Sequence, residues 1–458
     1  MTSHTPLNIL FIMSDQHNAR ALGCYGNGEV QTPHLDRLAS EGVRFGQAFC
    51  QTGQCSPSRY SILTGRFSRT HGLYANGNHE NPDVPTVVET FKAAGYATAT
   101  IGKHHLSMDR IPDRHGFDTV IDERDFSSFI QAESAPVYHR DGHWLPDFIH
   151  PGRSRVGRSH AGNAHHPSGY FAAETIAFLR RNRDKPFCVW CSFPDPHTPI
   201  APSEPWASMY EPDKLTLAPN VDYAFDYETP GLKQTQSKSG QFNEAYHRAC
   251  LAYYYGSVSQ IDYNIGLILD QLDRLGLSEK TLVVYTSDHG EMMGEHGAWT
   301  KGFLGYDATL RVPLIVRLPD AFPAGVEREE LVCLIDLAPT LLETAGLVGP
   351  SGQQGTSLAP LLTGRTEPWR DVIFSEIGEP RHHVTLTARS QSRKYVRFDR
   401  LTDGQVQTKY EQFFNLHLDP WEMRNEIENP LYGREIAALR QKLADWEAIT
   451  PAAPLPTQ

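Results

Sequence analysis

A possible nucleophile and two arginines stand close together near the start of the chain. Cys55-Ser-Pro-Ser-Arg59 is followed after three residues by Leu63-Thr-Gly-Arg66. Pro57 suits the first turn of a helix, so residue 55 is predicted to lie at a helix N-terminus. The free N–H groups and the positive dipole end of such a helix favour an anionic nucleophile and an anionic ester. Arg59, one turn further on, is predicted to brace the nucleophile; the alternative is a structural cysteine buried before a helix.

Two acid-containing pairs form a second group. Asp15-Gln16 and Asp288-His289 each follow an apolar run of strand length. Together with an atom of residue 55, they offer two carboxylates, an amide oxygen and an imidazole. Ca²⁺, Mn²⁺ and Mg²⁺ suit such oxygen-dominated ligands, and the single nitrogen favours Mn²⁺ slightly. The alternative is that each acid only caps a helix after its strand.

A third group is basic, and its members also follow apolar runs: Lys103, His105, His197 and Lys301. Cleavage of an anionic ester needs cations that stabilise the oxygens of the transferred group and an acid that protonates the departing alcohol. Taken singly, such a histidine is more often a surface or core residue than a catalyst. Their joint position favours a catalytic role. Asp307 and Arg311 follow Lys301 closely and are predicted to brace it.

The elements that must position these residues alternate along the chain. Strands are predicted at residues 8–13, 97–101, 187–193, 281–286 and 313–317. Helices are predicted at residues 32–41, 84–94, 170–181, 253–275 and 335–345. This alternation predicts an α/β fold with a mostly parallel sheet between helices. Because ligands bind beyond the carboxyl ends of such strands, the three groups of residues are expected to meet there.

The pattern changes near residue 369. Short strands are predicted at 385–389, 394–399 and 408–415, and a helix at 434–448. We therefore predict a catalytic domain at 1–368 and a smaller antiparallel α+β domain at 369–458. Residues 123–167 and 203–243 lack periodicity, so they are predicted to be either substrate-covering loops or flexible decoration.

Composition excludes some classes of partner. Of the 458 residues, 42 are Lys or Arg and 54 are Asp or Glu, which gives a net charge of −12. A protein that binds the phosphate backbone of nucleic acid normally carries the opposite sign. No apolar run reaches the roughly 18 residues of a membrane span. Neither a nucleic acid nor a membrane is therefore an expected partner.

The cysteines and the N-terminal residues bear on the cellular compartment. The seven cysteines are irregularly spaced, which does not indicate a disulfide framework. Cys188 and Cys191 lie in an apolar run, where a buried strand is favoured over a zinc or redox site. The first residues contain no basic segment of a secretory signal. A reduced, cytoplasmic location is the expectation.

The CxPxR segment and the LTGR segment at this spacing together resemble the signature of the type I sulfatases of the alkaline phosphatase superfamily. The similarity runs through the motifs from about residue 8 to 316, and more loosely through 414–425. It implies an alkaline phosphatase-like fold and the oxidation of Cys55 to formylglycine by a formylglycine-generating enzyme. It also implies hydrolysis of the sulfate monoester of a small alcohol through a covalent sulfo-enzyme intermediate, with one divalent metal ion, Ca²⁺, Mn²⁺ or Mg²⁺.

The resemblance assigns a role to each group. Lys103 and Lys301 would hold the sulfuryl oxygens, and Arg59 would support the nucleophile. His197 would assist the leaving group, and His105 would handle the protons of the hydrated aldehyde. The implied metal ligands are Asp15, Gln16, Cys55, Asp288 and His289.

Two positions depart from the pattern of many sulfatases. Those enzymes carry a second aspartate where Gln16 stands and often an asparagine where His289 stands. The pairs in this chain are similar to those of choline sulfatases and phosphonate monoester hydrolases. A hydrolase of phosphonate monoesters or phosphodiesters is therefore a second hypothesis, and a metal- or anion-binding scaffold without turnover is a third. The C-terminal sheet and helix could also form a homo-oligomer surface.

Overall fold

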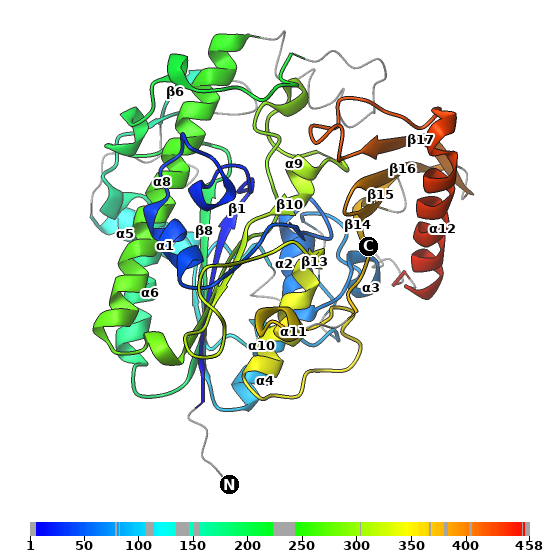
Figure 1. The fold of residues 1–458 in the computed structure, drawn as a ribbon. Helices are drawn as coiled ribbons and strands as arrows, with labels where there is room; N and C mark the ends of the chain where they lie inside the picture. The colour runs from blue at the N-terminus through cyan, green and yellow to red at the C-terminus, as the bar shows by residue number, and fades with distance from the viewer. Residues whose placement is uncertain are drawn as a thin grey trace.

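The centre of the molecule is a β-sheet that contains β1 and β8 (Figure 1). It has eight strands in the order β12-β2-β11-β9-β1-β8-β4-β5. The structure is a computed structural model that describes residues 6–77, 80–81, 83–106, 114–133, 146–150, 156–222, 243–302, 304–365, 368–379, 383–402, 405–450 and 452–453. β1 (Asn8–Asp15) lies between β8 (Phe187–Pro196) and β9 (Thr281–Ser287), and all three are parallel. β4 (Ala97–Gly102) and β5 (Thr119–Ile121) continue the parallel part beyond β8.

The other edge of this sheet is mixed. β11 (Leu314–Arg317) runs antiparallel to β9 and to β2 (Val43–Phe45), while β12 (Val326–Arg328) is parallel to β2. The five predicted strands are confirmed, but the last one reverses direction because the chain returns to it without a long crossover helix. A small separate sheet has the order β10-β3-β13 and consists of β10 (Arg311–Val312), β3 (Ala48–Phe49) and β13 (Val332–Cys333).

Both faces of the sheet are covered, as the buried strands require. In β1, Ile9, Phe11 and Met13 join one hydrophobic core, while Leu10 and Ile12 join the other. The first core is covered by α2 (Cys55–Thr64), α4 (Val87–Ala93) and α10 (Leu337–Thr344). The second is covered by α1 (Pro33–Ser40), α5 (Glu123–Ala132), α6 (Pro167–Arg181) and α8 (Glu244–Arg274). Figure 1 shows these two helical layers on either side of the sheet.

Helix caps explain where the sequence prediction missed boundaries. α8 begins nine residues before the predicted start, because the Asn243 side chain caps it by accepting from the Tyr246 N–H at 3.1 Å. α5 lies in the stretch predicted to be aperiodic, and that prediction is wrong there. Asp122 caps α5, and only Phe126 and Ile130 of its ten residues are buried, too few for a visible pattern.

Among the described helices, none is both long and apolar enough to cross a membrane.

The described remainder of the two aperiodic stretches, which leaves out residues 134–145 and 151–155 of the first, forms short elements. The first also contains β6 (Pro146–His150), which pairs with β7 (Val156–Ser159). The second contains single 3₁₀ turns at Trp206–Ser208 and Pro212–Lys214, and residues 223–242 lie outside the described part. The hypothesis that these stretches cover the substrate stays a prediction.

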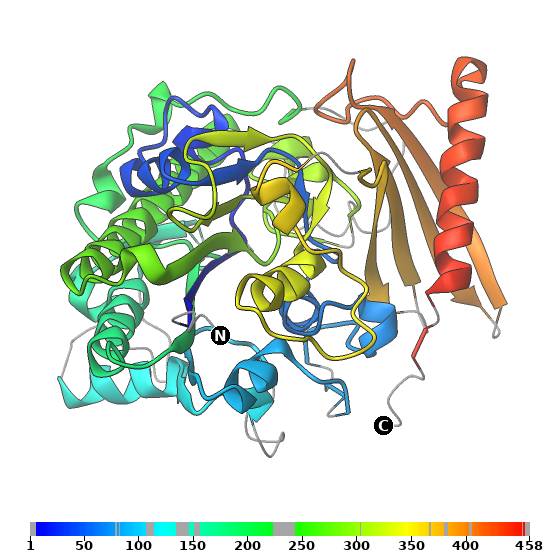
Figure 2. The ribbon, with the colours of Figure 1, turned by 60° about the horizontal axis from the view of Figure 1, so that its bottom comes forward.

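A second, antiparallel sheet carries the C-terminal part, as predicted. Its order is β14 (Val372–Glu379), β15 (His383–Ser390), β16 (Arg393–Thr402) and β17 (Gln405–Asn415). Figure 2 shows α12 (Gly433–Ile449) on the side of this sheet that faces away from the rest of the molecule. The sequence analysis missed β14. Because this sheet shares a hydrophobic core with the central one, the division at residues 368 and 369 stays a prediction.

Buried charges join the C-terminal sheet to the segment after Lys301. Lys394 is fully buried; its Nζ donates to Asp307 Oδ1 at 2.8 Å and pairs with Glu422. Arg389 Nη2 lies 3.1 Å from Asp307 Oδ2, and the Asp307 N–H donates to Glu422 Oε2 at 2.7 Å. Burial raises the pKa of Asp307, but Lys394 and Arg389 outweigh it and hold the pKa below its usual value.

The prediction that Asp307 and Arg311 brace Lys301 is wrong. Asp307 opens the four-residue helix α9 (Asp307–Leu310) and binds the C-terminal sheet through its carboxylate. Arg311 Nε donates to Gly46 O at 2.9 Å. These contacts hold the backbone at the far end of the segment that begins at Lys301, and they do not reach the Lys301 side chain.

We expect Lys394→Met to destabilise the protein, because it leaves Asp307 and Glu422 buried with one cation fewer. Removal of one partner from a buried ion pair costs about 3–5 kcal/mol of unfolding free energy. Urea denaturation measures the change. The matched control is Lys442→Met, which removes an exposed pair with Asp371 and should cost under about 1 kcal/mol. Equal midpoints for the two variants would contradict the assignment.

Candidate active site

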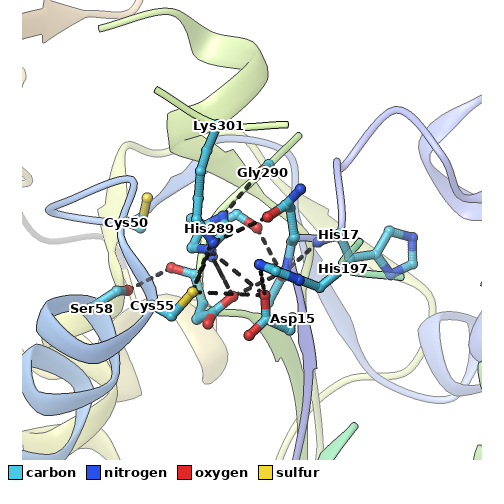
Figure 3. A network of polar contacts seen from close by, with 12 residues as sticks. Asp15, His17, Cys50, Cys55, Ser58, His197, His289, Gly290 and Lys301 are labelled. Atoms are coloured by element: carbon cyan, nitrogen blue, oxygen red, sulfur yellow. Dashed lines mark hydrogen bonds and ion pairs between the residues drawn. The ribbon is translucent and has the colours of Figure 1, made fainter. Parts of the chain in front are cut away.

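Polar residues from four neighbouring strands meet at the carboxyl edge of the sheet. Figure 3 shows Asp15, His197 and His289 of this group. Asp15 is the last residue of β1, His197 follows β8, and Asp288 follows β9. Lys103 follows β4 and its N–H donates to Ser192 O of β8 at 2.9 Å. The convergence that parallel strands predict is therefore present in the structure.

Four buried side chains can direct a ligand atom to one point. Asp15, Cys55, Asp288 and His289 each offer one atom, and these atoms all lie within 4.8 Å of one another. Cys55 Sγ is 3.3 Å from His289 Nε2 and 3.8 Å from Asp15 Oδ1. The His289 ring is oriented by its Nδ1, which donates to Gly290 O at 2.9 Å and leaves Nε2 directed at the group. Two carboxylates and one imidazole at this spacing fit a divalent cation.

Gln16 adds an amide oxygen beside this group. Its Oε1 accepts from Lys301 Nζ at 3.1 Å, and its N–H donates to Asp288 Oδ1 at 3.1 Å. The residue has a left-handed backbone with φ 66°, which is unfavourable for a side chain with a Cβ. The Tyr254 hydroxyl, which donates to Gln16 O at 2.7 Å, helps to hold this conformation.

Cys55 lies at the start of α2, as its proline predicts, and Gln54 is the N-cap. Lys301 Nζ is 2.8 Å from the Cys55 sulfur and 2.9 Å from His289 Nε2. Burial raises the pKa of the Cys55 thiol, but Lys301, Lys103 and His289 outweigh it and lower the pKa well below its usual value. Position 55 is therefore an electropositive place that stabilises an anionic nucleophile.

Arg59 contacts the carboxylates rather than Cys55 itself. Its Nε donates to Asp288 Oδ2 at 2.8 Å and its Nη2 to Asp15 Oδ2 at 2.9 Å. The side chain is 2% exposed, and Nη1 donates to Ser192 Oγ at 2.8 Å. Arg59 thereby fixes the distance between two strand ends.

Lys103 is the second cation on Asp15, and its Nζ lies 2.6 Å from Asp15 Oδ2. Burial lowers the pKa of Lys103, but the negative charges of Asp15 and Cys55 outweigh burial and raise the pKa above its usual value. The amine therefore stays charged. Gly102 makes this position accessible. It has φ 108°, and a Cβ there would lie 1.9 Å from Ser192 O, so only glycine permits the approach of Lys103 to β8.

The two predicted catalytic histidines lie on the open side of the group. His197 Nδ1 donates to Thr198 O at 2.6 Å, which leaves Nε2 free to face Asp15 Oδ1 at 4.0 Å. Burial, Lys103 and Lys301 lower the pKa of His197, while Asp15 opposes them. His105 is exposed and lies close enough to Cys55 to help lower the pKa of its thiol. All ten predicted site residues thus lie in one cluster or at its rim.

Sequence reasoning missed Glu291 and Ser192. Glu291 is fully buried and accepts a hydrogen bond from Gln16 Nε2. Its position two residues after His289 in a loop of mixed polarity gave no signal. Ser192 lies in the apolar strand β8, where a lone serine reads as a core residue, but its Oγ accepts from Arg59.

Comparisons with known proteins identify the family of the chain. The sequence model of the Sulfatase family matches residues 7–347, and that of the N-sulphoglucosamine sulphohydrolase C-terminal family matches residues 294–448. An arylsulfatase of Clostridium perfringens is 33% identical over 465 residues, which cover 95% of this chain and 93% of the relative. A choline-sulfatase of Rhizobium meliloti is 29% identical, with coverages of 94% and 84%.

A solved structure shows the same fold. The phosphonate monoester hydrolase of Agrobacterium radiobacter aligns with a TM-score of 0.82 at 24% identity, over 97% of this chain and 96% of its own. The expected alkaline phosphatase-like architecture is confirmed. The family match covers most of the chain and includes the strand ends that form the cluster. The chain therefore belongs to the sulfatase family of the alkaline phosphatase superfamily and is a hydrolase of the sulfatase type.

Proposed function

We propose that the protein hydrolyses a sulfate monoester with the help of a formylglycine derived from Cys55 and one divalent metal ion. The observation that carries the proposal is the position of residue 55. Its sulfur lies at a helix N-terminus, 2.8 Å from Lys301 Nζ and 3.3 Å from His289 Nε2. In the mature enzyme an oxygen of the hydrated aldehyde would stand where this sulfur stands. The similarity to an arylsulfatase and a choline-sulfatase supports a sulfate ester as substrate.

The metal ion would be held by five residues: Asp15, Gln16, Cys55 as formylglycine, Asp288 and His289. When bound, it supplies positive charge that polarises the ester oxygens. The ligand set favours Ca²⁺ or Mn²⁺, with Mg²⁺ as a third candidate. Arg59 keeps the two aspartates at a fixed separation through its hydrogen bonds to both.

The remaining residues act on the ester and on protons. Lys301 lies against Cys55 and Lys103 against Asp15, and both would hold the sulfuryl oxygens. His197 would protonate the leaving oxygen through Nε2, because Nδ1 is engaged with Thr198 O. An ester anion beside His197 raises its pKa and favours the protonated form that this role needs. His105 would remove a proton from the hydrated aldehyde, since it lies beside residue 55.

The proposal extends to the substrate, the maturation partner, the cellular location and the oligomer contact of the enzyme. The substrate is a small anionic ester, and a formylglycine-generating enzyme is the maturation partner that oxidises Cys55. The sequence supports a cytoplasmic location, and the seven cysteines are free in the structure. The outer surface of the C-terminal part is our candidate for a homo-oligomer contact.

A phosphonate monoester or a phosphodiester is the second candidate substrate. Both carry a single negative charge at neutral pH, as a sulfate monoester does. As metal ligands, Gln16 and His289 are uncharged, so they lower the negative charge of the ligand set, and they do not distinguish sulfur from phosphorus. The same site can therefore serve either element, and a direct comparison of esters decides between them.

We expect p-nitrophenyl sulfate to have a higher kcat/KM than p-nitrophenyl phenylphosphonate and bis(p-nitrophenyl) phosphate. All three are measured on one preparation in which peptide mass has verified the conversion of residue 55. Cys55→Ala is the background and should lose at least about a thousandfold, as for other nucleophile deletions. A preference for a phosphorus ester would overturn the sulfate assignment. Absence of turnover with every ester would favour a scaffold without activity.

Metal removal should abolish activity, because the two aspartates then bind only the protein's own cations. Activity is measured after treatment with a chelator and after addition of Mn²⁺, Ca²⁺ or Mg²⁺ to the metal-free protein. We expect recovery with Mn²⁺ or Ca²⁺. Full activity in thoroughly metal-free protein would show that the Asp15–Asp288 group is not a metal site.

His197→Ala should affect poor leaving groups most. An alkyl or unsubstituted phenyl sulfate leaves as a strong base and needs a proton, so its kcat/KM should fall by about 10²–10⁴-fold. p-Nitrophenolate leaves readily without a proton, so its loss should be much smaller. Steady-state kinetics on both esters gives the comparison. Equal losses would assign His197 to substrate binding rather than to proton transfer.

A further inference from the structure

A buried carboxylate that the proposed chemistry does not use lies against the metal ligands. Glu291 is fully buried in the loop that follows β9. Its Oε2 accepts from Gln16 Nε2, and its Oε1 accepts from the Met293 N–H at 3.2 Å. Every one of these partners is a donor, so Glu291 must present acceptors at both oxygens.

Glu291 settles which way the Gln16 amide points. The amide Nε2 faces the Glu291 carboxylate, and Oε1 faces the Lys301 ammonium at 3.1 Å. The reversed amide would place its oxygen against a carboxylate and its NH₂ against an ammonium group, and both contacts would be repulsive. The hydrogen-bond network therefore permits one orientation.

We infer that Glu291 is a positioning residue that holds the Gln16 amide oxygen toward the ligand group of Asp15, Asp288 and His289. The inference rests on the metal site of the proposed function. It also accounts for glutamine at position 16. A carboxylate there would lie against the buried carboxylate of Glu291, whereas an amide can donate to Glu291 and still offer an oxygen to the metal.

The backbone of Gln16 is fixed independently of Glu291. Its N–H is bound to Asp288 Oδ1, and its carbonyl is bound to the Tyr254 hydroxyl. A change at Glu291 therefore acts on the orientation of the side-chain amide and leaves the strand end in place. Such outer partners of metal ligands affect metal affinity more than they affect the fold.

The test is Glu291→Gln in the full-length protein. The new amide has one oxygen, but Gln16 Nε2 and the Met293 N–H each need an acceptor, so one of them is left facing an NH₂ group. We expect the dissociation constant of Mn²⁺ or Ca²⁺, titrated into metal-free protein by calorimetry, to rise about 10–100-fold. Glu291→Asp, which keeps the charge but is too short to reach both donors, should shift it in the same direction.

Glu295→Gln is the matched control. Glu295 is also a buried glutamate of this loop, but it pairs with Arg20. Its substitution removes a buried carboxylate four residues away without touching the Gln16 amide. It should lower the melting temperature of the metal-free protein and leave the metal dissociation constant unchanged.

A double-mutant cycle tests whether Glu291 acts through Gln16. In a Gln16→Ala background the amide is absent, so Glu291→Gln should cause no further loss of metal affinity. The same loss in both backgrounds would show that Glu291 acts through its charge or through general packing, and would overturn the inference. An unchanged dissociation constant in Glu291→Gln and Glu291→Asp would overturn it as well.

The failure of this inference differs from the failure of the proposed function. If the unaltered protein binds Mn²⁺ or Ca²⁺ and the Glu291 variants bind equally well, only the role of Glu291 is wrong. If the unaltered protein binds neither ion, the metal site of the proposed function is wrong and the inference falls with it.

Discussion

The guanidinium of Arg59 joins two buried carboxylates that come from different strands. Asp15 and Asp288 are fully buried, and two such charges cannot share a dry site without cations. Arg59 spans them with two hydrogen bonds of 2.8 and 2.9 Å, and Lys103 adds a second cation to Asp15. This contact forms because β1 and β9 run parallel, which brings their ends together, and because α2 places Arg59 beside them. Because Arg59 is one turn after Cys55, the same helix places both the brace and the nucleophile.

The C-terminal sheet takes part in this arrangement from a distance. Lys394 and Arg389 of the sheet bind Asp307, which closes the segment that begins at Lys301. The loop after β17 adds contacts on the other side, where Arg20 lies 4.0 Å from the centre of the Trp421 ring and donates to Pro420 O at 2.9 Å. Both segments that flank the site, after β1 and after Lys301, are thus tied to the C-terminal part. Pro420, Trp421 and Glu422, which lie in the stretch 414–425, make contacts of this kind.

Much of the fold and the cluster could be predicted, because strands buried on both faces give continuous apolar runs and their polar ends stand out. Lys103 and Asp288 were visible for that reason. β14 was missed because Glu376 and Gly378 interrupt its pattern, although Glu376 is buried against Arg69. The partners of Arg59 could not be predicted, since a sequence gives no distances between strand ends. Glu291 was missed because a buried acid has no periodicity of its own.

The charge balance of the cluster limits what it can bind. Lys103, Lys301 and Arg59 supply three cations against the carboxylates of Asp15 and Asp288, and burial raises the pKa of Glu291. A divalent cation at the proposed metal site would make the cluster more positive, and a monoanionic ester would leave positive charge in excess. That excess is available to stabilise the charge that develops on the leaving oxygen in a site with little water. An aspartate at position 16 would reduce that excess, so in the proposed function the amide at this position, and Glu291 as the residue proposed to orient it, preserve the electrostatic contribution to catalysis.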